Sequence, residues 1–201
     1  MTNQNGRRRG LFIVFEGIDG SGKSSMMKKV AKLFKDKGKT VWMTGEPTSS
    51  KIGKLARASL KRKINRRVMA LLMAADRLAH TDDIIESLAD PNKVILCDRY
   101  KYSALAYQTL SLAQETVETL NEGSIEPDIV LLLDVMPEIA VNRIGVRGSA
   151  TDVFETLETL KAVRQNYLDM HIENCIKINA NLTPEDVLEE IKLKLTKEGV
   201  L

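Results

Sequence analysis

A glycine-rich segment near the N-terminus narrows the choice of fold for this chain. Residues 17–24 read GIDGSGKS and fit the pattern G-x-x-x-x-G-K-[ST]. A short apolar run ending at Glu16 precedes the pattern, and residues 23–38 carry apolar side chains at helical spacing. Glycines let a backbone wrap closely around a phosphate group, and the N-terminus of the following helix attracts its negative charge. The segment therefore predicts a strand, a phosphate-binding loop and a helix in direct succession.

Short runs rich in β-branched residues and leucine alternate with helical segments along the rest of the chain. Such runs are typical of strands buried on both faces of a sheet. The predicted strands are residues 11–16, 40–44, 93–98, 128–134 and 176–178. The predicted helices include residues 68–88, 137–144 and 154–173 and a last helix that opens at Thr183. This order predicts an α/β fold of the P-loop NTPase type, a three-layer structure whose five-stranded parallel sheet is covered by helices on both faces.

The composition favours one ordinary globular domain. Apolar residues make up 43% and charged residues 28% of the chain, which excludes disorder and a disulfide scaffold. No internal repeat or linker is visible, so we predict one domain over residues 11–201, preceded by a flexible basic tail over residues 1–10. No apolar run is long enough to predict a membrane segment. Cys97 and Cys175 lie in apolar runs without metal-site spacing, so we expect two buried thiols and a cytoplasmic protein.

The charge balance directs attention to small ligands. The net charge of +3 is too small to indicate a nucleic acid polymer as partner, and a small anionic ligand is the better match. Within the loop, Lys23 is expected to reach the β- and γ-phosphates of a nucleoside triphosphate, and the Ser24 hydroxyl to bind Mg²⁺. The residues of this loop expected to bind the nucleotide are Gly17, Ile18, Asp19, Gly20, Ser21, Gly22, Lys23, Ser24 and Ser25. Such a loop by itself does not distinguish a kinase from a GTPase, a motor or a nucleotide-dependent switch.

A second charged site is predicted at the end of the strand over residues 93–98. Asp98 and Arg99 stand where this strand ends, and in a parallel sheet that end opens onto the same edge as the phosphate-binding loop. An arginine can bind a phosphate with two hydrogen bonds, and a carboxylate can hold Mg²⁺ or orient the attacking phosphate. The alternative is an ion pair between Asp98 and Arg99 on the surface.

Several motifs, taken together, resemble those of the thymidylate kinase family. They are FEGIDGSGKS at residues 15–24, EPT at 46–48, AADR at 74–77, DRY at 98–100, Ser103, and AYQ at 106–108. Their order and spacing match the family over essentially the whole chain after the first ten residues, and residues 46–53 are most similar to archaeal-type members. The resemblance implies transfer of the γ-phosphate of Mg·ATP to dTMP, giving dTDP and ADP. It also implies a homodimer, formed through apolar helix faces such as residues 68–75.

The resemblance also implies roles for individual residues. Asp19 is expected near the sugar hydroxyl and the acceptor phosphate, and Arg99 on that phosphate. Arg77 is expected to bind the pyrimidine base, where polar groups discriminate best between bases. The implied substrate-binding set is Asp19, Glu46, Pro47, Met73, Arg77, Arg99, Ser103, Ala104, Tyr107 and Gln108. The implied catalytic residues are Lys23, Arg99, Asp19 and Asp98, with Ser24 and Asp98 as the metal-binding pair.

Some of these residues have a simpler structural explanation. Tyr107 and Met73 stand at helical spacing and could belong to the core. Arg77 could pair with nearby acids on a solvated helix, namely Asp76, Asp82 or Asp83. His80 and His171 lie in helical segments without an obvious partner, so we assign them no role and expect surface or capping positions.

Three positions depart from the family pattern. Gly45 stands where relatives usually carry an arginine that contacts the acceptor phosphate, unless Lys51 or another basic side chain replaces it. Met73 stands where an aromatic ring usually stacks on the thymine. Gly20 stands where some members carry a basic residue. The first two departures keep open a broad-specificity (deoxy)nucleoside monophosphate kinase.

Family members with glycine at the Gly20 position usually compensate with arginines in a lid. Here the lid segment covers about residues 142–155, and its candidates for contact with the ATP phosphates are Arg143 and Arg147. Val153 occupies a place where an arginine often precedes Phe-Glu, and Arg147 could instead be a surface charge. This thin lid is the reason to keep a third alternative, a P-loop regulatory protein that binds nucleotide without kinase turnover.

Overall fold

The sheet has the predicted architecture. The computed structural model describes residues 9–62, 64–146 and 156–201. Its five strands are all parallel and lie in the order β2-β3-β1-β4-β5. The strand bounds differ from the predicted ones by one residue at most: β1 Leu11–Glu16, β2 Thr40–Gly45, β3 Lys93–Asp98, β4 Ile129–Asp134 and β5 Cys175–Asn179.

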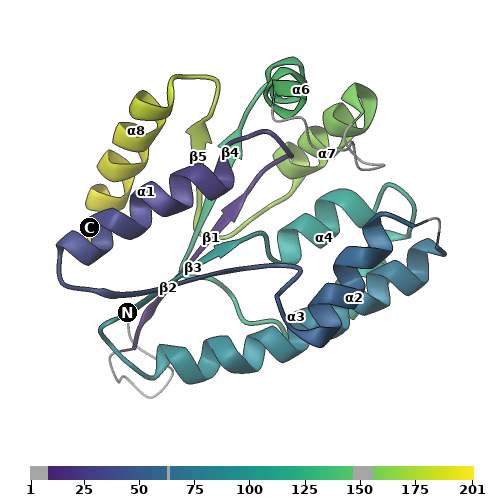
Figure 1. The fold of residues 1–201 in the computed structure, drawn as a ribbon, viewed down its shortest axis with the longest axis horizontal. Coiled ribbons are helices and arrows are strands. Elements are labelled where there is room, and N and C mark those ends of the chain that lie inside the picture. The colour runs from purple at the N-terminus through teal and green to yellow at the C-terminus, as the bar shows by residue number, and fades with distance from the viewer. Residues whose placement is uncertain (1–8, 63, 147–155) are drawn as a thin grey trace.

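Helices cover both faces of this sheet, as predicted (Figure 1). They are α1 Lys23–Asp36, α2 Lys51–Leu60, α3 Arg66–Leu88, α4 Lys101–Gln108, α5 Gln114–Leu120, α6 Pro137–Val146, α7 Leu157–Asp169 and α8 Pro184–Lys197. α1 and α8 lie on one side of the sheet and α3 on the other, where α4 packs against α3, α5 and α7. The predicted helix over residues 154–173 is too long at its C-terminal end, because Met170 has extended dihedral angles. None of the helices in the described ranges combines the length and apolar composition that a membrane span requires.

The alternation of side chains in β1 explains why its sequence is a continuous apolar run. Phe12 and Val14 pack with Ile84 of α3, whereas Ile13 and Phe15 belong to the cluster that includes Val30 of α1. Successive side chains of a strand point to opposite faces, so a strand covered on both faces needs apolar residues at every position. The central strand β1 therefore joins the two helical layers and holds its C-terminal end in a fixed place.

The carboxyl ends of the three strands that carry candidate residues meet at one edge. In the register, Asp98 of β3 lies beside Phe15 of β1 and Gly45 of β2. At Gly45 a Cβ atom would lie 2.9 Å from the carbonyl oxygen of Asp98, so only glycine fits without a shift of the backbone. This close approach gives a physical reason for the missing arginine at position 45.

Two features at the margins of the fold refine the predictions. The first described residue is Arg9, and residues 1–8 lie outside the described ranges. The Arg9 guanidinium pairs with both carboxylate oxygens of Asp128 at 2.9 and 2.5 Å, so residue 9 of the predicted tail has a defined contact. Cys97 is a fully buried thiol, as predicted. Cys175 is only partly buried, because it lies on the edge strand β5.

Candidate active site

The phosphate-binding loop directly follows β1 and leads into α1. The Lys23 ammonium donates to the carbonyl oxygens of Gly17 and Ile18, both at 2.9 Å. Burial lowers the pKa of Lys23 to about 8, with a further lowering from Arg99 that the nearby carboxylates only partly offset. The side chain therefore keeps most of its positive charge at neutral pH, at the N-terminus of a helix that also favours anions.

At Gly20 the backbone of the loop lies close to the backbone of α6. Its φ of +81° is in the left-handed region, and a Cβ atom at this position would lie 2.5 Å from the carbonyl oxygen of Ala140 in α6. A side chain at Gly20 would have to displace the backbone of α6 or of the loop. A basic residue therefore does not fit at position 20 of this structure without such a displacement.

Arg99 faces the loop. Its Nη2 atom lies 2.6 Å from Oδ1 of Asp19, its Nη1 donates to the Ser103 hydroxyl at 3.1 Å, and the guanidinium lies over the Tyr107 ring at 5.1 Å from the centroid. The predicted alternative, a surface pair between Asp98 and Arg99, is therefore wrong, because Asp19 is the partner of Arg99. The backbone of Arg99 has a φ of 68°, a left-handed value that is uncommon outside glycine.

The Asp19 carboxylate is held in its ionised form. Burial alone raises its pKa, but the positive charges of Arg99 and Lys23 outweigh burial and lower the pKa to about 2. Tyr107 also binds this residue, accepting a hydrogen bond from the Asp19 backbone N–H at 3.2 Å and donating one to Oδ2 at 3.2 Å. A carboxylate with this pKa orients cations at neutral pH and does not carry a proton there.

Asp98 and Ser24 form a pair that suits a hard cation. The Ser24 hydroxyl donates to Oδ2 of Asp98 at 2.5 Å. The other oxygen, Oδ1, is buried and accepts no hydrogen bond from any described residue. Within the described ranges no cluster of three or more His, Cys, Asp or Glu could hold a metal by itself. Mg²⁺ is commonly bound by one or two protein oxygens together with substrate phosphates and water, so the pair fits this ion.

Two adjoining cavities complete the site. The acceptor cavity, of about 270 Å³, is lined by all ten predicted substrate-binding residues and by Arg57, Leu60 and Met69. The loop cavity, of about 1110 Å³, extends over Gly20, Lys23, Ser24 and Asp98. Both cavities share the walls formed by Asp19, Glu46, Pro47, Arg57 and Arg99. The cavity at the phosphate-binding loop and the cavity at the predicted base-binding end therefore adjoin at these five residues.

Comparison with known proteins identifies the family of this chain. The family model described as thymidylate kinase matches residues 15–191. The chain belongs to the thymidylate kinase family. A protein named probable thymidylate kinase from Pyrococcus horikoshii is 41% identical, over 96% of this chain and 98% of its own. Proteins of the same name from Pyrococcus abyssi and Methanocaldococcus jannaschii are 38% and 40% identical and cover 96% and 90% of this chain, with 98% and 91% of their own.

Met73 and Tyr107 both line the acceptor cavity. Met73 is half-buried and lines the acceptor cavity. Tyr107 packs against the core with its ring and also lines the acceptor cavity, with its hydroxyl at Asp19. The core interpretation is thus partly right for Tyr107, while Met73 belongs to the cavity wall.

Arg77 is buried in the wall of the acceptor cavity, with 4% of its surface exposed. Its Nε donates to Glu46 Oε2 at 2.7 Å, its Nη1 to the Asn121 side chain and its Nη2 to the carbonyl oxygen of Tyr100 at 3.5 Å. The alternative of pairing with acids on its own helix is wrong. Asp76 instead accepts hydrogen bonds from the backbone N–H and hydroxyl of Thr48, both at 2.6 Å.

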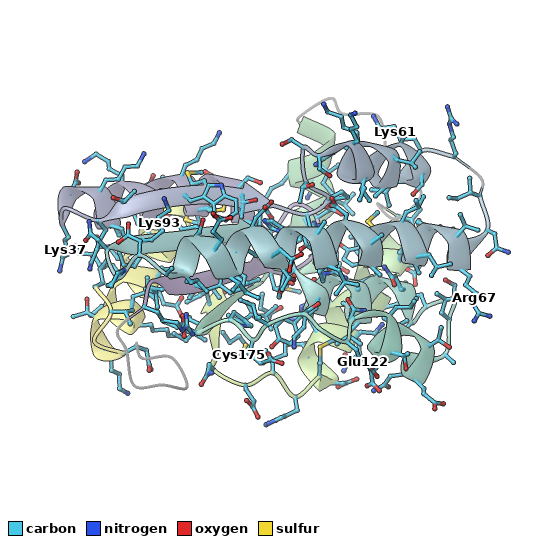
Figure 2. All side chains as sticks on the ribbon, turned by 90° about the horizontal axis from the view of Figure 1, so that it is seen from below. Lys37, Lys61, Arg67, Lys93, Glu122 and Cys175 are labelled. Carbon is cyan, nitrogen blue, oxygen red and sulfur yellow. The ribbon has the colours of Figure 1, made fainter. Side chains whose placement is uncertain are left out.

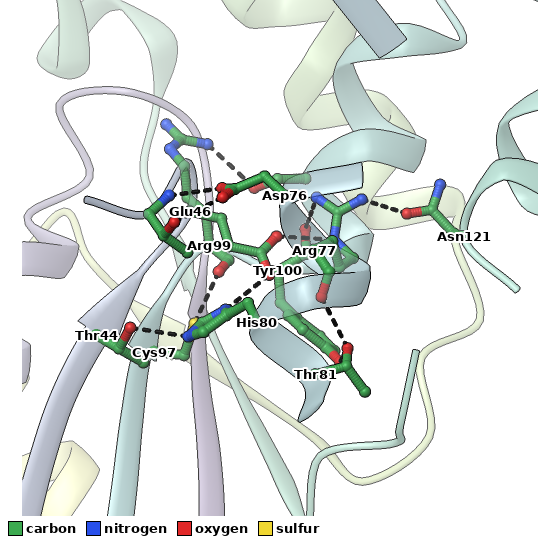
Figure 3. Close-up of polar contacts among 12 residues, drawn as sticks. Thr44, Glu46, Asp76, Arg77, His80, Thr81, Cys97, Arg99, Tyr100 and Asn121 are labelled. Atoms are coloured by element: carbon green, nitrogen blue, oxygen red, sulfur yellow. Dashed lines mark hydrogen bonds and ion pairs between the residues drawn. The ribbon is translucent and has the colours of Figure 1, made fainter. Parts of the chain in front are cut away.

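His80 corrects the prediction of a surface or capping position. It is 3% exposed, and its two ring nitrogens contact Glu46 Oε1 at 3.0 Å and Thr44 Oγ1 at 2.8 Å (Figure 3). It follows Arg77 by three residues on α3 and therefore shares its inward face. Its partners come from the end of β2, which the helical pattern alone could not reveal. His171 is exposed, as predicted.

Glu16 is a buried carboxylate that the sequence analysis overlooked. Its Oε1 accepts hydrogen bonds from the backbone N–H groups of Tyr100 and Ser103 at 2.9 and 3.1 Å, and its Oε2 from the hydroxyls of Ser103 and Tyr167 at 2.6 and 2.8 Å. Burial raises the pKa of Glu16, against the lowering effect of these bonds and of Arg99. Glu16 thus caps the start of α4 beside Arg99. An acid at the end of a buried apolar strand was the available signal.

Arg57 was also overlooked. It lies in α2, lines both cavities and donates to the carbonyl oxygen of Pro47. Lys51, the replacement suggested for the arginine missing at Gly45, is exposed and lines neither cavity. No local pattern marks Arg57, because its place depends on the packing of α2 against α3.

The lid candidates are only partly within the described ranges. Arg143 donates to the carbonyl oxygen of Ala180 at 2.9 Å and lines neither cavity. It follows Ala140, the residue that contacts the loop at Gly20, by three residues on α6 and so lies about one turn further along the same face. Arg147, Val153 and the rest of residues 147–155 lie outside the described ranges.

Proposed function

We propose that the protein transfers the γ-phosphate of ATP to the 5′-phosphate of dTMP, yielding dTDP and ADP. The observation that carries the proposal is the wall shared by the two cavities, where Arg99 is paired with Asp19 of the phosphate-binding loop. Lys23 and Arg99 both line the loop cavity, which supports a donor phosphate at Lys23 and an acceptor phosphate at Arg99 within one space. Membership of the thymidylate kinase family and the names of the relatives support this substrate pair.

The reaction needs positioning and charge stabilisation more than covalent chemistry. The bond between the γ-phosphorus and the β–γ bridging oxygen breaks, and a bond forms from that phosphorus to an oxygen of the dTMP phosphate. Lys23 and Arg99 stabilise the negative charge that spreads over the transferred group. Asp19, ionised at neutral pH, orients Arg99 and takes up no proton. The acceptor is itself an anionic phosphate, so no general base is required.

ATP and Mg²⁺ have a matching set of groups. The loop cavity is lined by Asp19, Gly20, Gly22, Lys23, Ser24 and Ser25, but not by Gly17, Ile18 or Ser21. For the ATP phosphates this part of the loop offers backbone N–H groups, the Lys23 ammonium and the Ser24 hydroxyl. Ser24 and Asp98 would hold Mg²⁺, which when bound neutralises phosphate charge and fixes the orientation of the phosphates. Arg143 is the proposed lid residue, because it lies one turn from the contact between α6 and the loop.

The dTMP site comprises the acceptor cavity. Arg77 binds the base, Ser103 and Ala104 border the 5-methyl group, and Tyr107 and Gln108 close the nucleoside pocket. A second cation for the acceptor phosphate comes from the Arg57 side chain, which lines both cavities. It takes the place of an arginine for which position 45 has no room.

Turnover of five monophosphates with Mg·ATP tests this proposal. We expect kcat/KM for dTMP to exceed that for dCMP, dAMP and dGMP by roughly a hundredfold or more, because the wrong base leaves buried polar groups unpaired. dUMP, which lacks only a methyl group, is expected to lose about tenfold. Equal kcat/KM values for all five would favour a broad-specificity kinase, which the flexible Met73 side chain supports. Phosphorylation of none of them would contradict any kinase assignment.

We also propose that residues 11–201 act as one kinase domain that pairs with a second copy through α3. This helix crosses the front of the molecule in Figure 2. Its outward side carries a row of large exposed apolar side chains at helical spacing, Val68, Leu71, Leu78 and Ile85. A single row of this kind on one long helix suits a two-fold contact, in which the same surface of both copies meets.

A charge in this row is expected to separate the copies. Leu71→Glu places a carboxylate in the proposed interface and should raise the dissociation constant of the dimer by roughly a hundredfold, as loss of a buried hot spot does. The matched control is Leu193→Glu, which changes an even more exposed leucine, 70% against 49%, on the distant helix α8. Sedimentation velocity over a concentration series measures both. A Leu71→Glu protein that stays dimeric would place the interface elsewhere.

A further inference from the structure

A buried carboxylate joins the base-binding arginine to a histidine. Glu46 directs Oε2 to Arg77 Nε at 2.7 Å and Oε1 to His80 Nδ1 at 3.0 Å (Figure 3). All three side chains are nearly fully buried. The backbone N–H of Glu46 donates to the carbonyl oxygen of Asp98 at 3.0 Å, so the residue that carries this carboxylate is itself anchored to β3.

The His80 ring is held on both sides. Its Nε2 atom lies 2.8 Å from the Thr44 hydroxyl, and its ring meets the Trp42 ring edge to face at a centroid distance of 5.8 Å. A neutral imidazole satisfies this arrangement if Nδ1–H donates to Glu46 and Nε2 accepts from the Thr44 hydroxyl. Each carboxylate oxygen of Glu46 then has one donor of its own.

Arg77 is in turn restricted to one orientation. Glu46, Asn121 and the carbonyl oxygen of Tyr100 take up three of its donors. A guanidinium has five N–H donors and no acceptor, so about two donors remain for a ligand in the acceptor cavity. They match a pyrimidine with a carbonyl oxygen at position 4, as in thymine and uracil, and mismatch the amino group at that position of cytosine.

We propose that His80 is a positioning residue for base recognition: it holds one oxygen of Glu46 so that the other fixes Arg77 toward the keto edge of the pyrimidine. This inference rests on the proposed function and deepens it. Without His80, the carboxylate is free to turn and bind Arg77 with both oxygens, a preferred geometry for this ion pair. The guanidinium would then turn away from the base, although the pocket would keep its charge and shape.

The test compares His80→Leu with His80→Asn. Leucine fills the space without a donor, whereas the amide nitrogen of asparagine lies close to the place of Nδ1 and can still donate to Glu46. We expect His80→Leu to reduce the ratio of kcat/KM for dTMP over dCMP by about tenfold, the loss of one well-placed hydrogen bond to a charged group. His80→Asn should keep the ratio within about threefold of the unmodified protein. KM for ATP should stay unchanged in both.

Equilibrium binding of dTMP and dCMP to the same proteins supplies a readout that does not need turnover. If the unmodified protein binds dTMP selectively but phosphorylates neither nucleotide, the result contradicts the proposed function but not this inference. The inference is wrong if His80→Leu weakens both nucleotides equally, since a merely structural role predicts that result. Thr44→Val provides a second variant, should His80→Leu fold poorly. It removes the hydroxyl on the far side of the ring and is expected to reduce the same ratio by about threefold, and an unchanged ratio would contradict the proposal.

Discussion

Replacing Arg99 by alanine is expected to lower kcat with dTMP by about 10³-fold or more, while the affinity for ATP changes by less than about threefold. The guanidinium lies where the two cavities meet, paired with Asp19 and supported by the Ser103 hydroxyl. We therefore expect Arg99 to contact the acceptor phosphate and the transferred group, and the donor phosphates to depend on Lys23 and the loop backbone. Single-turnover kinetics together with binding of a non-hydrolysable ATP analogue measure the two quantities separately.

The effect of Arg99→Ala can be assigned to the loss of the guanidinium side chain. The residue at position 99 has a φ of 68°, and both arginine and alanine carry a Cβ atom, so backbone strain is similar in the two proteins. Arg99→Lys is the matched control, because it keeps the charge but loses the planar fork that binds Asp19 and Ser103 and that we expect to bind a phosphate. We expect kcat of Arg99→Lys to lie between the values of the unmodified protein and of Arg99→Ala. A small effect of Arg99→Ala on turnover would instead favour a regulatory nucleotide-binding protein.

Gly20→Ala is expected to lower the free energy of unfolding by about 2–4 kcal/mol and kcat/KM for ATP by roughly a hundredfold. The added Cβ atom would lie 2.5 Å from the carbonyl oxygen of Ala140, and neither backbone can yield without moving the loop relative to α6. A loop that moves to relieve this contact would no longer direct its N–H groups at the ATP phosphates. Urea unfolding and steady-state kinetics measure the two effects.

Gly38→Ala is the control for backbone strain. Gly38 has a φ of +77°, nearly the same as Gly20, but nothing lies within 4 Å of the position of its Cβ atom. We expect a loss of about 1 kcal/mol from strain alone and unchanged kinetics. Equal destabilisation by the two substitutions would mean that the contact with α6 is unimportant. The missing basic residue at position 20 would then need another explanation.

Local patterns were enough for the parts of the site that are local in the chain. Residues 11–24 contain a strand, the glycine-rich loop and the start of a helix in direct succession, so the loop geometry follows from local backbone chemistry. The parallel sheet was predictable for a related reason, because strands covered on both faces must be apolar throughout. Asp98 and Arg99 were recognisable because the carboxyl ends of parallel strands share one edge.

Other parts of the site depend on which distant segments meet. Glu46 and His80 are 34 residues apart, and Glu16 and Tyr167 are 151 residues apart. A helical pattern shows that His80 follows Arg77 on one face, but not that the end of β2 lies against that face. Because a local pattern does not show which distant segments come into contact, Arg57 was overlooked and acids on the solvated side of its own helix were considered as partners of Arg77.

The amino-acid sequence by itself determined the phosphate-binding loop, the parallel sheet and the family, because each is written in short segments with fixed spacing. Only the tertiary structure decided the charge partners of Arg99 and Arg77, the burial of His80 and Glu16, and the lack of room for a side chain at Gly20 and Gly45. The physical reason is that hydrogen bonds, charge pairs and steric contacts act over a few ångströms in space. Packing of the helices on the sheet selects which side chains come within that range.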